Sequence, residues 1–224
     1  MNPIKPTFKT EILPILFILV AAVSAFYFYA HFPEQVPMHW NMAGEIDRYG
    51  SRMSGAFSIP AVIIGMYLLF LLIPYIDPRR ERYQQFRKVY HFFKAYIMFF
   101  MLAIYYLIAL NALGYKAEVG LWVPIMVGIL FIIIGNYLSK VKPNWFVGIR
   151  TPWTLSSEEI WNKTHRVGGK LFILGGLLMI VIPFVPNVYK LAIFIFIISL
   201  ILVGTIGYSL ILYLKEKKNG KPNN

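Results

Sequence analysis

Six long apolar stretches constrain this chain more than any other feature of its sequence. They cover approximately residues 12–30, 57–76, 95–113, 121–138, 167–185 and 191–214. A helix that crosses the hydrocarbon core of a bilayer needs about 20 predominantly apolar residues, and each stretch is close to that length. The chain is 58% hydrophobic, above the roughly 45–50% of ordinary soluble domains. We therefore expect an all-α, polytopic membrane protein with six transmembrane helices.

The first stretch also has some features of a secretory signal. Lys5 and Lys9 precede it, and the tripeptide Val23-Ser24-Ala25 resembles a cleavage site. However, the apolar run continues through four aromatic residues, 26–29, and is longer than the core of a signal peptide. We expect an uncleaved helix here.

The basic residues fall unevenly on alternate connections between the stretches. Only four of the 22 Lys and Arg residues, namely Arg48, Arg52, Lys116 and Lys190, fall in one set of connections. Cytoplasmic connections retain Lys and Arg, so the set with the other 18 is predicted to be cytoplasmic. Both termini are then predicted to lie in the cytoplasm, with the protein in the cell membrane. The net charge of +12 favours contact with anionic lipid headgroups. It does not indicate direct nucleic-acid binding, because the charges are spread over several segments.

The central parts of the six stretches contain no Asp, Glu, Lys, Arg or His. Ion-coupled transporters keep such groups at membrane depth, so their absence argues against proton-driven transport. The most polar residues there are Asn111, Asn136, Ser199 and Thr205. A small-solute transporter stays open as an alternative that requires a water-filled cavity lined by Asn111 and Asn136. The chain has no cysteine, which excludes disulfides and thiol chemistry.

Glycine pairs spaced seven residues apart occur in the fourth and fifth stretches. The pairs are Gly128 with Gly135, Gly168 with Gly175, and Gly169 with Gly176. Seven residues make nearly two helical turns, so each pair marks one helix face on which another backbone can approach closely. We expect these faces to pack within one helix bundle.

The connection over residues 31–55 is the larger of the predicted outer loops. Pro37 favours extended backbone, and the segment from Asn41 to Gly44 suggests a turn. Two histidines and three carboxylates are present, but not at a spacing typical of a metal site. We expect no metal and no cofactor here, but a packed cap with Trp40 and Tyr49 at the membrane interface.

The connection over residues 139–170 has the strongest local signals. Ser156 and Glu159 have the spacing of a capping box, which predicts a helix start. A helix from this point would present Ile160, Trp161, Thr164, His165 and Gly168 on one face and continue into the fifth stretch. The residues before it must turn the chain, and Gly148 permits a tight turn.

Arg150 is the residue in this turn that lacks an evident structural role. Its guanidinium could bind a lipid phosphate, a carboxylate such as that of Glu158, or a partner protein. Nearby serines, glutamates and His165 are not spaced to align a nucleophile with a base. We therefore expect a protein that is not an enzyme.

Two segments resemble known families. "PMHWNMAGEIDRYGSR", residues 37–52, resembles DUF1648, a short domain of unknown function found in bacterial membrane proteins. "GNYLSKVKPNWFVGIRTPWTLSSEEIWNKTHRVGGK", residues 135–170, resembles the signature of the SdpI family of bacterial immunity proteins. The resemblance implies a DUF1648-like region at 1–92, with two helices and the outer loop. An SdpI-like region at 93–224 follows, with four helices and the inner signature loop.

The resemblance also implies a function and site residues. Members of the family protect a bacterium from a secreted toxic peptide, and some also signal by holding a cytosolic transcriptional repressor at the membrane. The signature falls on Gly148, Arg150, Thr151, Pro152, Trp153, Thr154, Trp161, Asn162 and Arg166. In the outer loop the candidate residues are Pro37, His39, Trp40, Asn41 and Gly44. The expected partners are therefore membrane lipids, a toxic peptide and a repressor.

Overall fold

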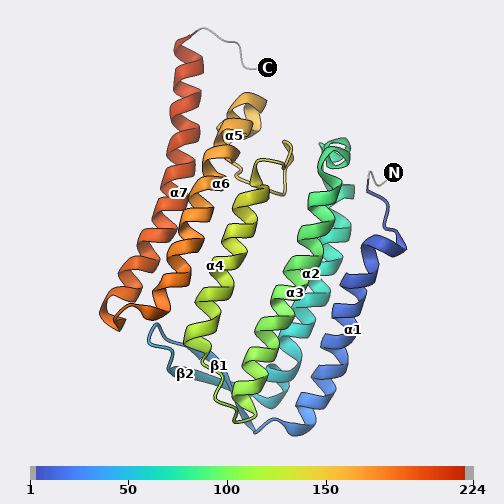
Figure 1. Cartoon of the computed structure of the whole chain (residues 1–224). Coiled ribbons are helices and arrows are strands. Elements are labelled where there is room, and N and C mark those ends of the chain that lie inside the picture. Colours follow the sequence, from blue (N-terminus) through green and yellow to red (C-terminus); the bar gives the residue numbers. More distant parts are fainter. Residues whose placement is uncertain (1–3, 220–224) are drawn as a thin grey trace. The chain divides into compact units, whose positions relative to one another are not determined.

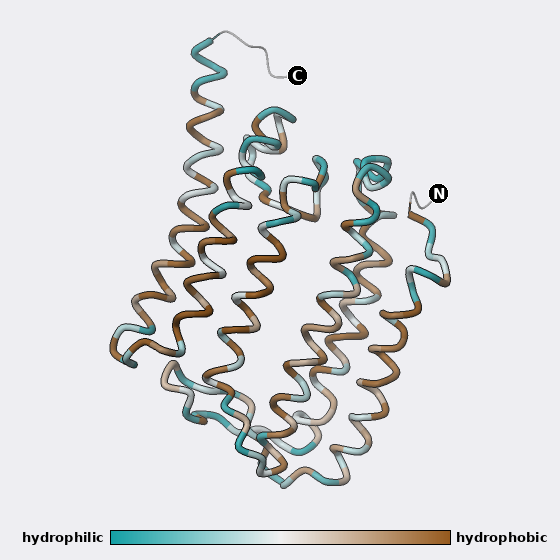
Figure 2. Tube along the Cα trace, viewed as in Figure 1, coloured by the Kyte–Doolittle hydropathy of each residue, from teal (hydrophilic) through white to brown (hydrophobic). Residues whose placement is uncertain are grey.

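The computed structural model describes residues 4–219 and confirms the all-α, six-span architecture (Figure 1). The long helices are α1 (Phe8–His31), α2 (Arg52–Ile76), α3 (Arg87–Ala112), α4 (Val119–Leu138), α6 (Glu158–Val181) and α7 (Asn187–Lys218). Shorter elements are the strands β1 (Gln35–Trp40) and β2 (Ile46–Ser51), the 3-10 helices η1 (Arg80–Phe86) and η2 (Ile182–Phe184), and the helix α5 (Pro152–Ser156). Apolar residues dominate the long helices, and hydrophilic residues gather at their ends and connections (Figure 2). The chain is a multi-pass membrane protein. The cytoplasmic position of its termini stays a prediction.

The described chain forms two compact units. The hairpin unit comprises residues 5–72 and 90–126, and the loop unit comprises residue 4 with residues 73–89 and 127–219. The units alternate along the sequence. The 3-10 helix η1 belongs to the loop unit, whereas α3, which follows it, lies mostly in the hairpin unit. The predicted regional division between residues 92 and 93 stays a prediction.

The hairpin unit has a core of aliphatic and aromatic side chains from α1, α2, α3 and β1. Phe28, Val36, Ile63 and Met98 are among its buried members. Tyr105 is also buried, and its hydroxyl donates to the carbonyl of Ala56 at 2.7 Å. The bond satisfies a polar group that would otherwise be costly in this apolar surrounding.

The connection over residues 31–55, predicted to be an outer loop, folds into an antiparallel β-hairpin, which the sequence analysis did not predict. Strands β1 and β2 pair with a register shift near His39. The predicted turn is confirmed: Asn41 Oδ1 accepts from the amides of Ala43 and Glu45 at 2.9 and 3.0 Å, and Gly44 has φ 85°. The expected cap is only partly packed, because Tyr49 is 52% exposed.

Glycine allows the hairpin to lie directly against α2 and the first turn of α4, which belong to the same unit. A Cβ atom at Gly120 would lie 2.7 Å from Gly44 Cα, so the hairpin tip contacts the first turn of α4 through backbone atoms. At the other end, a Cβ atom at Gly55 of α2 would lie 2.6 Å from Val36. These contacts fix the hairpin as a structured element.

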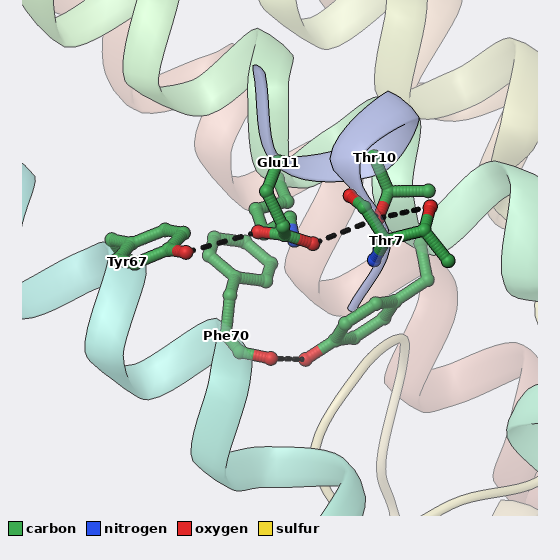
Figure 3. Close-up of polar contacts among 7 residues, drawn as sticks. Thr7, Thr10, Glu11, Tyr67 and Phe70 are labelled. Carbon is green, nitrogen blue, oxygen red and sulfur yellow. Dashed lines mark hydrogen bonds and ion pairs between the residues drawn. The ribbon is translucent and has the colours of Figure 1, made fainter. Parts of the chain in front are cut away.

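A buried ion pair joins α1 to α3 in the hairpin unit. Lys94 Nζ lies 2.5 and 2.7 Å from the two carboxylate oxygens of Glu11, and both residues are buried. Thr10 and Tyr67 also donate to this carboxylate, as Figure 3 shows. The sequence analysis missed the pair because the two residues directly precede the stretches predicted at 12–30 and 95–113, whereas the helices begin earlier.

In the loop unit, α4 and α6 approach each other at paired glycines. Gly128 faces Gly176, and Gly135 faces Gly169, each close enough that a Cβ atom would meet the opposite backbone carbonyl. The other face of α6 meets α7, where Gly175 lies against Ile197 and Ile201. The prediction that the spaced glycines mark helix-packing faces is therefore confirmed.

We predict that Gly135→Ala destabilises the protein. The new Cβ atom would lie 2.5 Å from the carbonyl oxygen of Gly169, and overpacking of this kind costs about 1–3 kcal/mol. Gly207→Ala is the matched control, because nothing lies within 4 Å of its Cβ position. Unfolding by sodium dodecyl sulfate, followed by circular dichroism, measures both variants. Equal stability of the two would contradict the packing described here.

A second prediction concerns the ion pair. Lys94→Met leaves the Glu11 carboxylate buried without its cation, which should cost about 3–5 kcal/mol. The double variant Glu11→Leu/Lys94→Met removes both charges and should recover most of that loss. The same denaturation measurement compares the three variants, including Glu11→Leu alone. If the double variant were as unstable as the sum of the single variants, the pair would not be coupled as described.

Candidate functional site

The signature loop, defined here as residues 139–157, connects α4 to α6. The loop contains the short helix α5, which the sequence analysis did not predict. Because of α5, the helix α6 starts later than predicted. Ser157, not Ser156, caps α6, and its hydroxyl accepts from the amide of Ile160 at 3.3 Å. Ser156 ends α5 and donates to the carbonyl of Trp153 at 3.0 Å. The predicted capping box of Ser156 and Glu159 was therefore wrong by one residue at its start.

Two threonines of the family signature build α5. Thr151 precedes the helix with extended backbone, and its hydroxyl accepts from the amide of Thr154 at 3.1 Å. In return, the Thr151 amide donates to the Thr154 hydroxyl at 2.8 Å. Pro152 occupies the first helical position, where its missing N–H group has no cost. Thr151 Oγ1 also lies 3.1 Å from Ser209 Oγ, which joins the loop to α7.

His165 and Trp161 of α6 pack against the signature loop and bond to its backbone. Trp161 is buried, and its indole N–H donates to the carbonyl of Val141 at 2.9 Å. The ring of His165 stacks on it with the centroids 4.0 Å apart. The amide of Ile149 donates to His165 Nε2 at 3.0 Å, so the ring proton lies on Nδ1, 2.8 Å from the Trp161 carbonyl. The imidazole is thus neutral and serves as a hydrogen-bonding support.

Gly148 has to be glycine in this turn for two reasons. Its φ is 112°, which residues with a side chain rarely adopt. A Cβ atom there would also collide with His165 Nε2. The expectation that Gly148 permits a tight turn is confirmed.

A buried polar network fixes the first half of the loop. Asn144 is fully buried, and its Oδ1 accepts from the amides of Phe146 and Val147 at 2.9 and 2.6 Å. Asp77, between α2 and η1, has a 1% exposed side chain and accepts from the Trp145 amide at 3.0 Å. These bonds hold the backbone of residues 145–147 in one conformation, although the segment has no regular secondary structure.

Arg150 lies exposed on this framework. Its Nη1 donates to the carbonyl of Trp145 at 2.8 Å. Glu158, one of the three partners that the sequence offered for Arg150, pairs with Arg82 at 2.7 Å. Arg166 is exposed as well, whereas Trp153 and Asn162 are half-buried. The structure therefore brings part of the signature together around one turn, where Gly148, Thr151, Pro152, Thr154 and Trp161 shape the backbone and Arg150 is exposed. It shows no contact of Asn162 or Arg166 with this turn among the described residues.

The outer-loop candidates lie on the hairpin of the other unit. Pro37 is buried in β1, and Trp40 is half-buried at its end. His39 Nδ1 lies 2.6 Å from Asp47 Oδ1 in an exposed pair. Asn41 and Gly44 form the turn described above. Within residues 4–219, no group of three or more His, Cys, Asp or Glu side chains is arranged to hold a metal ion.

Sequence reasoning missed several residues that define the site. Asp77, Tyr83 and Ser209 lie far from the signature loop in sequence, and no local pattern links them to it. Asn144 carries a usable signal, since Asn in a turn commonly accepts from the amides two and three residues later.

These features define an all-α, multi-pass membrane protein with an ordered signature loop in one unit and a β-hairpin in the other. Residues 140–211 match the SdpI/YfhL protein family, and residues 15–64 match the domain of unknown function DUF1648. The immunity protein SdpI of Bacillus subtilis (strain 168) is 29% identical over 196 residues, which cover 87% of this chain and 91% of that protein. No solved structure matches the chain significantly. Both resemblances found in the sequence are therefore confirmed as matches over these residues.

We predict that Asn144→Ala loosens the signature loop. It leaves the amides of Phe146 and Val147 without their acceptor, at a cost of about 1–3 kcal/mol. Asn136→Ala is the control, because Asn136 is exposed and donates only to Ile132 in its own helix. Limited proteolysis of the purified proteins should cut the first variant between residues 139 and 157 faster than wild type. Equal cleavage of the two variants would show that Asn144 does not hold the loop.

Proposed function

We propose that this chain is a membrane immunity protein that protects a bacterium from a secreted toxic peptide. The similarity to the immunity protein SdpI over 87% of the chain carries this proposal. It is supported by the construction of the signature loop, whose residues build one ordered turn instead of a flexible connection. On this proposal the protein acts by binding and has no enzymatic activity.

The proposed role of the signature loop is recognition through Arg150. A guanidinium presents five N–H donors in a planar fork that suits carboxylate or phosphate groups. One nitrogen of Arg150 donates to Trp145, and the exposed side chain leaves its other donors accessible. The surrounding buried network already holds the backbone of the loop in place. Little conformational entropy would therefore be lost on binding.

The hairpin is the proposed contact for the toxic peptide on the outer side. His39, Asp47 and Tyr49 are exposed along it, whereas Gly44 and Val36 fix it to α4 and α2. A fixed element with exposed polar and aromatic side chains suits peptide binding, because it needs little rearrangement.

Retention of a cytosolic repressor at the membrane is a second proposed role. It is favoured by exposed cationic side chains in the loop unit, including Arg80, Arg87, Lys88 and Arg150. Such a surface would attract an acidic protein segment at long range. The transporter alternative has less support, because Asn111 donates to Ala117 and Asn136 to Ile132, so each amide is bound locally.

The immunity proposal predicts survival of a toxin-sensitive bacterium that produces this protein during exposure to a secreted peptide toxin of the Sdp type. Arg150→Ala should lower the protective effect by about tenfold in toxin concentration, the size expected when a charge-assisted hydrogen bond is lost. Lys217→Ala removes an exposed cation on α7, outside the loop, and should protect like wild type. His39→Ala tests the hairpin in the same assay.

Membrane levels of all variants must match for the comparison. If wild type gives no protection at confirmed expression, immunity against that toxin is wrong. If Arg150→Ala protects fully while wild type also protects, the recognition role of the signature loop is wrong.

A further inference from the structure

The peptide groups of Trp145 are held from two sides by residues of opposite charge. The Trp145 amide donates to Asp77 Oδ2 at 3.0 Å, and the Trp145 carbonyl accepts from Arg150 Nη1 at 2.8 Å. Asp77 is buried, whereas Arg150 is exposed. One residue of the loop backbone therefore connects a buried carboxylate to the exposed guanidinium.

Asp77 is itself firmly fixed. Its Oδ1 accepts from the Arg79 amide at 2.7 Å, and its Oδ2 accepts from the Tyr83 hydroxyl at 2.8 Å. That hydroxyl also lies 3.3 Å from Asn144 Oδ1. A buried carboxylate with three donors is strongly held in place, because any shift would leave it unsatisfied in an apolar surrounding.

Further contacts join the segment between α2 and α3 to the end of the signature loop and to the start of α6. Arg79 Nη2 donates to the carbonyl of Leu155 at 2.9 Å, and Arg82 pairs with Glu158 at 2.7 Å. The segment that links α2 to α3 is thus bonded to the signature loop at several points, although about 70 residues of sequence separate them.

We propose that Asp77 is a positioning residue for Arg150, acting through the backbone of Trp145. This inference rests on the proposed function, in which Arg150 contacts a partner. With Asp77 in place, the Trp145 carbonyl holds one nitrogen of the guanidinium and thereby sets the direction in which its remaining donors point. Without Asp77, the Trp145 amide loses its acceptor, and the peptide group that carries the Trp145 carbonyl keeps only the bond from the Phe146 amide to Asn144. Arg150 is then anchored less firmly.

The first test uses purified full-length protein and phenylglyoxal, a reagent that modifies arginine. The ratio of the Arg150 to the Arg166 modification rate, measured by mass spectrometry of peptides, reports release of the Arg150 side chain. Asp77→Ala should raise this ratio about fivefold, the population change expected when one hydrogen bond is lost. Asp47→Ala, which removes an exposed carboxylate of the hairpin, should leave it unchanged.

The conservative variant Asp77→Asn distinguishes positioning from a general loss of structure. Its amide oxygen can take the place of Oδ2 and accept from both Tyr83 and Trp145, whereas its NH2 group takes the place of Oδ1 and cannot accept from the Arg79 amide. The ratio should therefore fall between those of Asp77→Ala and wild type. An unchanged ratio in folded Asp77→Ala would overturn the proposal. If Asp77→Ala does not fold, Tyr83→Phe decides: it removes one bond to Asp77, and a ratio equal to that of wild type would overturn the proposal, whereas an increase supports it.

The survival assay separates this inference from the proposed function. If wild type protects, Asp77→Ala should lose protection to the level of Arg150→Ala, and the double variant should be no worse than either. Additive losses in the double variant would show that Asp77 acts by another route and would overturn the proposal. If wild type does not protect, the immunity proposal fails, and the modification ratio still decides whether Asp77 positions Arg150.

Discussion

Close backbone contact between α4 and α6 is the constraint on which the loop unit depends. Apolar side chains gain little from leaving lipid for another apolar surface, so membrane helices associate through close packing and hydrogen bonds. The glycine pairs Gly128–Gly176 and Gly135–Gly169 provide that packing over two contacts along the helices. The second pair lies close to Leu138, where α4 ends, so it fixes the point from which the signature loop begins. With its starting point fixed, the loop can be shaped by a few polar bonds.

Those polar bonds then determine what the loop exposes. Asn144, Asp77 and His165 are buried side chains that accept hydrogen bonds from loop amides. Each bond replaces water for a backbone group, which is what allows an irregular segment to be ordered next to apolar helices. The buried side chains of the loop unit therefore hold the loop backbone, and the Arg150 side chain is exposed, with one nitrogen bonded to the Trp145 carbonyl. The proposed recognition role follows from this division.

The parts of the structure that could be predicted from sequence are those with local causes. Apolar runs predicted the six spans, seven-residue spacing predicted the glycine faces of α4 and α6, and Gly148 predicted the turn. The missed features depend on contacts between distant segments. Asp77 meets Trp145 across 68 residues, and Glu11 meets Lys94 across 83 residues. The hairpin was missed for a different reason, since β2 is mostly exposed and lacks the alternation of apolar and polar residues that reveals a strand.

The most direct test of this structure is hydrogen exchange of the amides in residues 145–151, with the protein in lipid bicelles. Trp145, Phe146, Val147, Ile149 and Thr151 all donate to side-chain acceptors of the loop unit. We predict that these amides exchange far more slowly than unstructured peptide amides, because the loop must open before exchange can occur. Exchange at the rate of an unprotected loop would contradict the central claim that the signature loop is a preformed surface.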